Sequence, residues 1–358
     1  MTDITTFETR KTNLGETRVT TRTASVPPGG ALLKVERFAF TANNVTYGVV
    51  GERIGYWKFF PTADEDWGVI PVWGTAEVIE SDGDLPFGER LYGYLPMASH
   101  LVIEPARIKE GALFDGAAHR AELPPVYNRY TRLAAEPDYD SAMDDERMVL
   151  WPLYATSFCL YDWLLDNDWH GAGQVILPSA SSKTAIGTAY AIRTDANAPR
   201  LIGVTSPRNE AAVTALGLYD AVVLYDDIET GVPQAPSVIV DMSGSGEVLG
   251  RLHKHLGEDM RFTSNVGVTH YSDAGMGPDF IRERSEMFFA PGHIQKRSKD
   301  WGPGEFDRKA AAFWRDAAIK SRGWLTIQTG TGVDAVKGAY LDVLAGKTPA
   351  DRSWVVEI

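Results

Sequence analysis

The first hundred residues alternate between hydrophobic and polar positions in short segments that glycine and proline separate. Residues 31–40 (ALLKVERFAF) and 75–81 (TAEVIES) show this alternation, and residues 82–96 (DGDLPFGERLYGYLP) are typical of a turn followed by a further strand. A period of two places alternate side chains on the same face of a sheet. The pattern therefore predicts a β-rich N-terminal region.

From Glu146 the spacing of the hydrophobic residues changes. Residues 145–168 carry apolar side chains at helical intervals, with Pro152 as an expected kink. Strands are then expected at 174–179, 200–206, 221–226, 236–244 and 260–268, and helices at 183–193, 208–217 and 246–257. This alternation predicts an α/β domain built on a doubly wound parallel sheet with helices on both faces.

After Gly302 the pattern predicts a helix at 304–322, a strand at 323–332, a helix at 333–347 and a terminal strand at 352–358. This extra set suggests that the chain returns to complete the β-rich region. Two aromatic-rich segments, 105–145 and 269–304, look too long and irregular for ordinary connections. Such segments are typical of functional lids or of an oligomer contact.

Composition and charge narrow the class of protein. The net charge of −13 argues against a nucleic-acid-binding surface. The apolar runs are shorter than a membrane span, and the first ten residues have no apolar signal core, so a soluble cytoplasmic protein is expected. The single cysteine, Cys159, excludes an internal disulfide and a multi-cysteine zinc cluster, and its helical spacing among apolar residues predicts a buried structural thiol.

The segment PSASSKT, residues 178–184, joins an expected strand to an expected helix. Its end, SKT, mimics a Walker loop, but the glycines that such a loop requires are missing. A strand, a tight turn and a helix N-terminus can also hold a dinucleotide pyrophosphate, and small side chains at Ser179, Ala180, Ser181 and Ser182 would allow close approach, with Lys183 adding positive charge. The alternative is a polar turn without a ligand.

The next expected strand bears on the choice of cofactor. In NAD-binding folds this strand ends in an acidic residue that binds the ribose 2′-hydroxyl. Here it ends in Thr205 and Ser206, followed by Arg208, and no acid is present. A hydroxyl and a guanidinium suit a 2′-phosphate, so NADP(H) is favoured over NAD(H). A solvated surface position is the equally weighted alternative for Arg208.

The order of these segments resembles the medium-chain dehydrogenase/reductase superfamily, specifically its zinc-independent quinone-oxidoreductase and enoyl-reductase branch. ALLKVERFAFTANNVTYGVVGE is similar to the first strands and asparagine-containing turn of that family, and VIPVWGTAEVIES with PFGERLYGY is similar to its P-G-x-E-x-x-G-x-V and G-D-R-V segments. LGLYDAVVLYDD and VIVDMSGSG resemble L-G-A-D-x-V-I-x-Y and V-x-D-x-V-G-G. The resemblance covers essentially the whole chain.

The resemblance implies a GroES-like β-rich domain at 1–135 and 318–358, and a Rossmann domain at 136–317. It also implies a homodimer and a small-molecule substrate. It places the pyrophosphate at Ser179, Ala180, Ser181, Ser182 and Lys183, the 2′-phosphate at Ser206, Arg208 and Tyr225, and the nicotinamide near residues 265–268, beginning at Asn265. Asp241, Ser243 and Gly244 would follow the fourth Rossmann strand.

The chain departs from the zinc-dependent members of the superfamily. The segments that would carry the catalytic zinc ligands read FAFTANN and PVWGTAE. His253 and His255 are two residues apart on an expected helix and do not share a face. No metal site is therefore predicted.

Without zinc, reduction of an alkene or quinone needs a hydrogen bond to the carbonyl and, for an alkene, a proton donor. A tyrosine can serve both purposes, and the resemblance points to Tyr56, with Tyr47 as the alternative. Four further aromatic residues are expected to line a pocket or lid, or else to pack in the core: Tyr127, Tyr130, Phe288 and Phe289.

The predicted function is zinc-independent, NADPH-dependent reduction of an enone, an enoyl thioester or a quinone by direct hydride transfer. A second hypothesis is a non-catalytic binding or regulatory protein that retains the fold with an altered cofactor site. The glycine-free turn is the feature that favours this second hypothesis.

Overall fold

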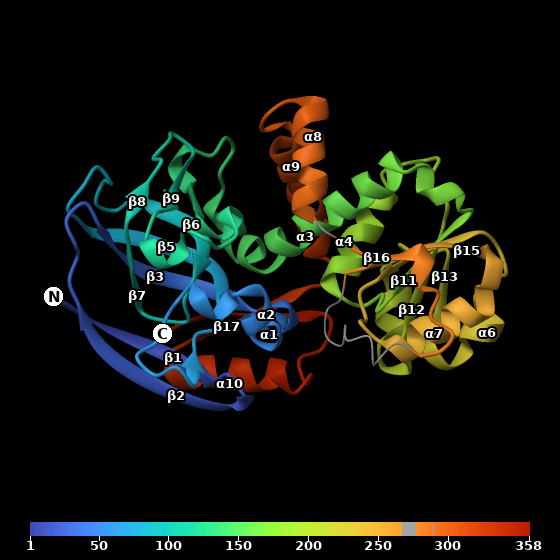
Figure 1. The fold of residues 1–358 in the computed structure, drawn as a ribbon, viewed down its shortest axis with the longest axis horizontal. Coiled ribbons are helices and arrows are strands. Elements are labelled where there is room, and N and C mark those ends of the chain that lie inside the picture. The colour runs from blue at the N-terminus through green and yellow to red at the C-terminus, as the bar shows by residue number, and fades with distance from the viewer. Residues whose placement is uncertain (267–276, 289) are drawn as a thin grey trace. The chain divides into compact units, whose positions relative to one another are not determined.

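The computed structural model describes residues 1–266, 277–288 and 290–358. The chain forms two compact units (Figure 1). The first contains Met1–Val149 together with Thr326–Ile358, and the second contains Leu150–Leu325. Among the helices of the described ranges, none is long and apolar enough to cross a membrane.

The first unit is built from two sheets. A three-stranded sheet has the order β2-β1-β4, and a larger sheet has the order β17-β18-β3-β5-β6-β10-β9-β8, with β7 also paired to β3. The strands are β1 Thr2–Arg10, β2 Asn13–Ala24, β3 Ala31–Phe40, β4 Trp67–Gly68, β5 Val72–Ser81, β6 Arg90–Leu95, β7 His100–Ile103, β8 Pro105–Ala106, β9 Ala112–Asp115, β10 Arg129–Arg132, β17 Thr326–Thr331 and β18 Arg352–Glu357.

The C-terminal strands belong to the same sheet as the N-terminal ones. β18 pairs antiparallel with β3, where Trp354 lies opposite Phe40 and Val356 lies opposite Phe38, and β17 runs parallel to β18. The helix between them, α10 (Val333–Leu344), carries the buried Tyr340, whose hydroxyl donates to the Leu14 carbonyl at 2.7 Å.

The asparagine-containing segment is a helix rather than a turn. α1 (Ala42–Val49) is followed by the short α2 (Gly51–Ile54). Asn44 Oδ1 accepts from the backbone N–H of Thr41 at 2.8 Å, and its Nδ2 donates to the Pro71 carbonyl at 2.9 Å. These bonds satisfy a buried amide and fix the start of the helix. Tyr47 lies one turn further along α1.

The second unit contains one parallel sheet of six strands in the order β13-β12-β11-β14-β15-β16. The strands are β11 Gln174–Pro178, β12 Arg200–Thr205, β13 Ala221–Leu224, β14 Ser237–Asp241, β15 Met260–Asn265 and β16 Ser285–Met287. The order reverses at β11, because the next two strands lie on one side of it and the later three on the other. This order is that of the Rossmann fold. The predicted fold class, a Rossmann domain plus a GroES-like β-rich domain, is confirmed.

Helices cover both faces of this sheet. α3 (Asp144–Asp166) and α4 (Lys183–Ile192) pack on one face around Leu177 and Val240, whereas α6 (Ile228–Gly231) and α7 (Gly246–Leu256) pack on the other around Ile176 and Ile239. Because neighbouring residues of each strand enter different cores, the strands are apolar on both sides. The other helices are α5 Glu210–Ala215, α8 Ala290–Trp301 and α9 Glu305–Ser321.

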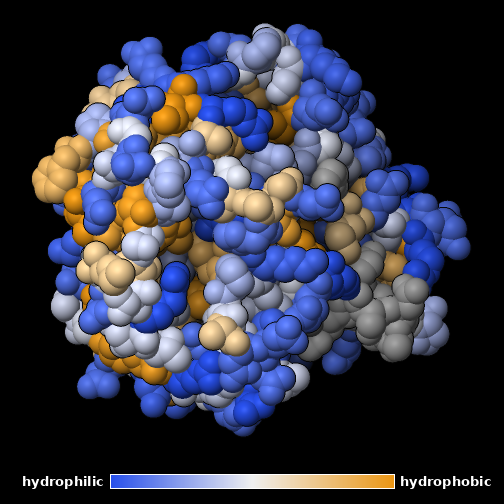
Figure 2. Space-filling view, turned by 60° about the vertical axis from the view of Figure 1, so that its left-hand side comes forward, coloured by the Kyte–Doolittle hydropathy of each residue, from blue (hydrophilic) through white to orange (hydrophobic). Residues whose placement is uncertain are grey.

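The two segments expected to be irregular contain regular structure. β9 and β10 lie within 105–145, and β16 and α8 lie within 269–304. The surface seen in Figure 2 is largely hydrophilic, with hydrophobic residues gathered in small patches, as the charge of −13 leads one to expect. Among the described residues, the most exposed large hydrophobic side chain after Met1 is that of Phe87.

Candidate functional site

The turn after β11 keeps a glycine-like backbone without glycine. Ser179 has a φ of +60°, in the left-handed region that glycine adopts most easily. The Ala180 N–H donates to the Val204 carbonyl at 3.0 Å, and the Ser182 N–H donates to the Ser179 carbonyl at 2.8 Å. Ser182 Oγ then accepts from the Ala185 N–H at 3.3 Å and caps α4. The turn is therefore fixed by its own hydrogen bonds, and Lys183 is the first residue of α4.

The strain at Ser179 leads to a stability prediction. Ser179→Val is expected to be about 1–2 kcal/mol less stable than Ser179→Gly, because a β-branched side chain disfavours a left-handed backbone that glycine adopts freely. The measurement is chemical denaturation of the two variants under identical conditions. Equal stability of the two would mean that the turn relaxes out of the left-handed region at no cost.

Tyr225 lies against this turn. Its hydroxyl accepts from the Ser179 N–H at 3.1 Å. Burial raises the pKa of Tyr225, although the hydrogen bonds with Ser179 oppose the shift. Two residues predicted to hold a cofactor, Ser179 and Tyr225, are thus in direct contact. The same contact uses a backbone N–H that the turn would otherwise present to a phosphate.

The end of β12 lies beside the same turn. Asn209 Nδ2 donates to Ser181 Oγ at 2.9 Å, and the Ser206 carbonyl accepts from the Asn209 N–H at 3.0 Å. Arg208 is exposed two residues beyond Ser206. Thr205 Oγ1 is buried and has no hydrogen-bond partner among the described residues. The predicted pyrophosphate and 2′-phosphate segments are therefore neighbours.

Two further polar residues lie at the same edge of the sheet. Asp241 ends β14 and is fully buried; its carboxylate accepts from the N–H groups of Ser243 and Gly244 at 2.9 and 3.0 Å, and from Ser243 Oγ at 2.6 Å. Burial raises the pKa of Asp241 even though these three donors oppose it. Asn265, opposite Asp241 on β15, donates from Nδ2 to the Glu286 carbonyl at 3.1 Å. Of the predicted range 265–268, residues 267 and 268 lie outside the described residues.

These segments meet where the strand order reverses. The carboxyl ends of β11, β12, β14 and β15 form one edge of the parallel sheet. In open α/β sheets, ligands bind outside the carboxyl ends of the strands at this topological switch point. The edge carries a helix N-terminus, small side chains in the turn and the buried Thr205 hydroxyl, which has no hydrogen-bond partner among the residues that the structure describes.

The first unit holds a cluster of aromatic side chains that contains both candidate tyrosines. The rings of Tyr47 and Tyr56 are 4.6 Å apart between centroids, and both side chains are buried. Tyr47 Oη accepts from Asn43 Nδ2 at 2.7 Å and from Trp73 Nε1 at 3.3 Å. Burial raises the pKa of Tyr47, the nearby Tyr56 adds to the shift, and the two hydrogen bonds oppose it.

Tyr56 has a different partner. Its hydroxyl lies 3.0 Å from that of Tyr127, and either oxygen can donate. Burial raises the pKa of Tyr56, and the hydrogen bond from Tyr127 opposes the shift. Tyr94 packs against Tyr127 with ring centroids 4.6 Å apart, and its buried hydroxyl has no partner within the described ranges. Tyr130 is fully buried, and its hydroxyl donates to the Tyr94 carbonyl at 2.9 Å, so this residue packs in the core.

Sequence reasoning did not identify Asn43, Trp73 or Tyr94 as members of this cluster. Asn43 and Trp73 lie in FAFTANN and PVWGTAE, the two segments that lack zinc ligands. Phe288 packs against Trp163 in the second unit, with ring centroids 5.9 Å apart, and Phe289 lies outside the described residues.

Residues 38–349 match the family described as "Protein of unknown function (DUF2855)". The chain belongs to this family. No curated protein matches the sequence. Three solved structures are similar to this DUF2855 protein in fold: an alcohol dehydrogenase from Thermotoga maritima (12% identity, 100% of both chains, TM-score 0.61), a mutant enoyl thioester reductase from Candida tropicalis (10%, 100% of both chains, 0.59) and S. aureus TarJ in complex with NADPH (10%, 99% of both chains, 0.58). At these identities the likeness shows the fold alone, a Rossmann unit together with a β-rich unit.

Two histidines of α7 and the cysteine of this DUF2855 protein lie in structural surroundings. His253 is buried, its Nε2 lies 2.8 Å from Thr263 Oγ1, and burial lowers its pKa to about 4. His255 Nε2 lies 2.8 Å from the Val232 carbonyl, and Cys159 is buried. Within residues 1–266, 277–288 and 290–358, no group of three or more His, Cys, Asp or Glu side chains is arranged to hold a metal ion.

Proposed function

We propose that this protein is a zinc-independent, NADPH-dependent oxidoreductase that reduces an enone, an enoyl thioester or a quinone by direct hydride transfer. The observation that carries the proposal is the turn at the switch point of the second unit. It keeps a left-handed residue at Ser179 in spite of the strain that serine incurs there. Residues held in such strained conformations cluster at functional sites.

The residues at this edge fit a phosphorylated dinucleotide. The turn from Ser179 to Lys183 would hold the pyrophosphate at the N-terminus of α4, and Ser206 and Arg208 would hold the 2′-phosphate. The buried Thr205 hydroxyl, which has no partner among the described residues, supplies a further donor beside them. When bound, the nicotinamide supplies a hydride to an electrophilic carbon.

Tyr47 is the hydrogen-bond donor that the local geometry favours. A phenol oxygen can accept two hydrogen bonds and donate one. Trp73 Nε1 can only donate, and the Asn43 amide donates as well, so both acceptor positions of the Tyr47 oxygen are filled. The hydroxyl proton of Tyr47 is then available for a hydrogen bond to the substrate. The same two donors would stabilise the phenolate that remains after proton transfer.

The hydroxyl of Tyr56 is less suited to this role, because it shares a hydrogen bond with Tyr127 and has no donor comparable to Trp73 among the described residues. Asn43 and Trp73 lie in the two segments where zinc-dependent relatives would carry metal ligands. We infer that these segments polarise the carbonyl through Tyr47, which takes the place of a metal.

The cofactor part of the proposal is tested with Arg208→Ala. Titration calorimetry is expected to give NADPH binding weakened about tenfold, with NADH binding unchanged, because only the 2′-phosphate loses a charged hydrogen bond. Arg200→Ala is the matched control: it removes an exposed arginine at the opposite end of β12. Equal losses for both nucleotides in Arg208→Ala would contradict the assignment.

A second function is favoured by one observation. The Ser179 N–H is bonded to Tyr225, and Ser182 caps its own helix, so two groups suited to a phosphate are already satisfied. A non-catalytic binding or regulatory protein would have this arrangement. The test is to add millimolar NADPH. This alternative is supported if NADPH does not raise the melting temperature and is not oxidised with any of the three substrate classes.

A further inference from the structure

The second unit has a pocket of about 360 Å³ beside β15 and β16. Trp163, Phe262 and Phe288 form its aromatic walls, and Ser264, Glu286 and Lys296 contribute polar groups. None of the residues proposed to hold the cofactor lines it. Ser264 and Asn265 are successive residues of β15, so their side chains point to opposite faces of the sheet. The pocket is therefore separate from the proposed cofactor site and falls in the size range of small-molecule sites.

A buried hydroxyl in this pocket is unsatisfied. The side chain of Ser264 is 1% exposed, and its Oγ has no hydrogen-bond partner in the described part of the chain. Leaving such a group unpaired is unfavourable, so it normally has a protein or ligand partner. His170 Nε2, which is buried nearby, also lacks a partner among those residues.

The wall behind the pocket is held by a strained turn. Asp168, Trp169, His170 and Gly171 all have left-handed φ values, between 49° and 69°. Three of them are not glycine, and each such residue is disfavoured. The turn places the His170 ring flat on Phe262, with centroids 4.3 Å apart and an interplanar angle of 10°, and Trp163 lies against both rings. The strained turn therefore holds the His170 ring against Phe262, one of the aromatic walls of the pocket.

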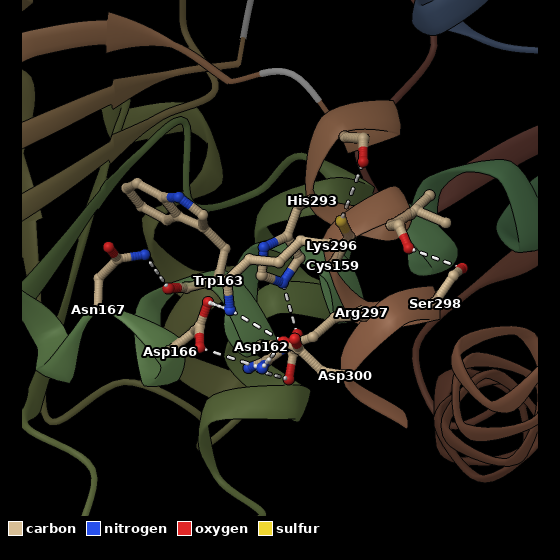
Figure 3. A network of polar contacts seen from close by, with 12 residues as sticks. Cys159, Asp162, Trp163, Asp166, Asn167, His293, Lys296, Arg297, Ser298 and Asp300 are labelled. Carbon is tan, nitrogen blue, oxygen red and sulfur yellow. Dashed lines mark hydrogen bonds and ion pairs between the residues drawn. The ribbon is translucent and has the colours of Figure 1, made fainter. Parts of the chain in front are cut away.

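The permanent charges that line the pocket are those of Asp166, Glu286 and Lys296, a small excess of negative charge. Figure 3 shows Asp162 and Asp166 of α3 facing His293, Lys296, Arg297 and Asp300 of α8. Arg297 binds Asp162 and Asp300, and Lys296 binds Asp166 at 2.7 Å and Asp300 at 3.0 Å. Three carboxylates thus face two permanent cations. Glu286 adds another carboxylate; it is exposed and acts electrostatically on the nearby His170.

We propose that this pocket binds a small planar aromatic amine in its cationic form. The ring would lie against Trp163 and Phe288, and the ammonium group would donate to Glu286 and to Ser264 Oγ. Aromatic faces attract both a planar ring and a nearby cation, and the Glu286 carboxylate favours a positive charge over a negative one. The buried hydroxyl then gains the partner that it lacks.

Three probes of the same shape test the charge preference on the full-length protein by titration calorimetry: 2-naphthylmethylamine, 2-naphthalenemethanol and 2-naphthoate. The amine is expected to bind about fivefold more tightly than the alcohol, and the carboxylate most weakly. Glu286→Gln is expected to lower the affinity for the amine to that for the alcohol. Glu283→Gln, which removes an exposed carboxylate that does not line the pocket, is expected to keep the preference.

Ser264→Ala separates a binding role from a structural one. It is expected to weaken amine binding about fivefold without lowering the melting temperature, because it removes a buried hydroxyl that has no partner. Absence of amine binding, equal affinity for the three probes, or an unchanged preference in Glu286→Gln would overturn the proposal. NADPH binding is expected to be the same in all these variants, so the outcome is distinct from that of the proposed function.

Discussion

Replacing Tyr47 by phenylalanine is expected to lower kcat by about 10²- to 10⁴-fold, the usual contribution of a positioned acid. The substitution removes one oxygen and keeps the ring that packs against Tyr56 and Tyr94. NADPH affinity is expected to be unchanged, because the proposed cofactor residues belong to the second unit. The measurement is steady-state NADPH oxidation with whichever enone, enoyl thioester or quinone is turned over, together with calorimetric NADPH binding.

Tyr56→Phe is the comparison, because it removes a hydroxyl from the same aromatic cluster. We expect it to lower kcat less than tenfold, since its hydroxyl is engaged with Tyr127. Full activity in Tyr47→Phe together with a large loss in Tyr56→Phe would reverse the assignment. Burial raises the pKa of Tyr47 above its ordinary value of 10, so the acid form persists through neutral pH. Activity is accordingly expected to stay constant across neutral pH and to fall only under strongly alkaline conditions.

The doubly wound sheet could be predicted from the sequence because its strands are short apolar runs between amphipathic helices. This pattern has few alternatives once strands and helices alternate. α8 was missed for the opposite reason. Its first residues are Ala290, Pro291 and Gly292, of which proline and glycine are poor helix formers. Among the described residues of α8, His293 alone is buried. Only Ala290, Ile294 and Trp301 form its apolar side in the described part of the chain, and an ionic network with α3 supplies much of the rest of the contact, so the apolar pattern that would indicate a helix is weak.

Backbone conformation was the part of the site least accessible to sequence reasoning. The small residues of the turn after β11 could be recognised, but a serine does not predict a left-handed φ. The residue types of Asp168, Trp169 and His170 do not predict one either. The surrounding fold imposes these conformations, whereas local preference opposes them. The tyrosines could be named as candidates. Their ranking depended on Asn43 and Trp73, which lie 30 residues apart in the chain and converge on one oxygen only in the folded unit.

Asp115→Ala is expected to destabilise the first unit by about 3–5 kcal/mol. Asp115 and Arg120 form a buried ion pair at 3.2 Å, and each side chain is 1% exposed. Arg120 also packs over the rings of Phe59 and Phe60, which border the tyrosine cluster, and it donates to Tyr130 Oη at 3.4 Å. Removal of the carboxylate leaves a guanidinium buried without its counter-charge, and guanidinium cannot lose its proton to escape the penalty.

Arg120→Met is expected to be less harmful than Asp115→Ala, although it breaks the same pair. Asp115 Oδ1 still accepts from the N–H groups of Glu104 and Ala117, at 3.2 and 3.0 Å, and a carboxylate can take up a proton when its partner is lost. Methionine also keeps much of the packing against the two phenylalanine rings. Chemical denaturation of both variants measures the difference. If Arg120→Met proved the less stable of the two, packing of the arginine stem, rather than the unpaired charge, would dominate the stability of this wall.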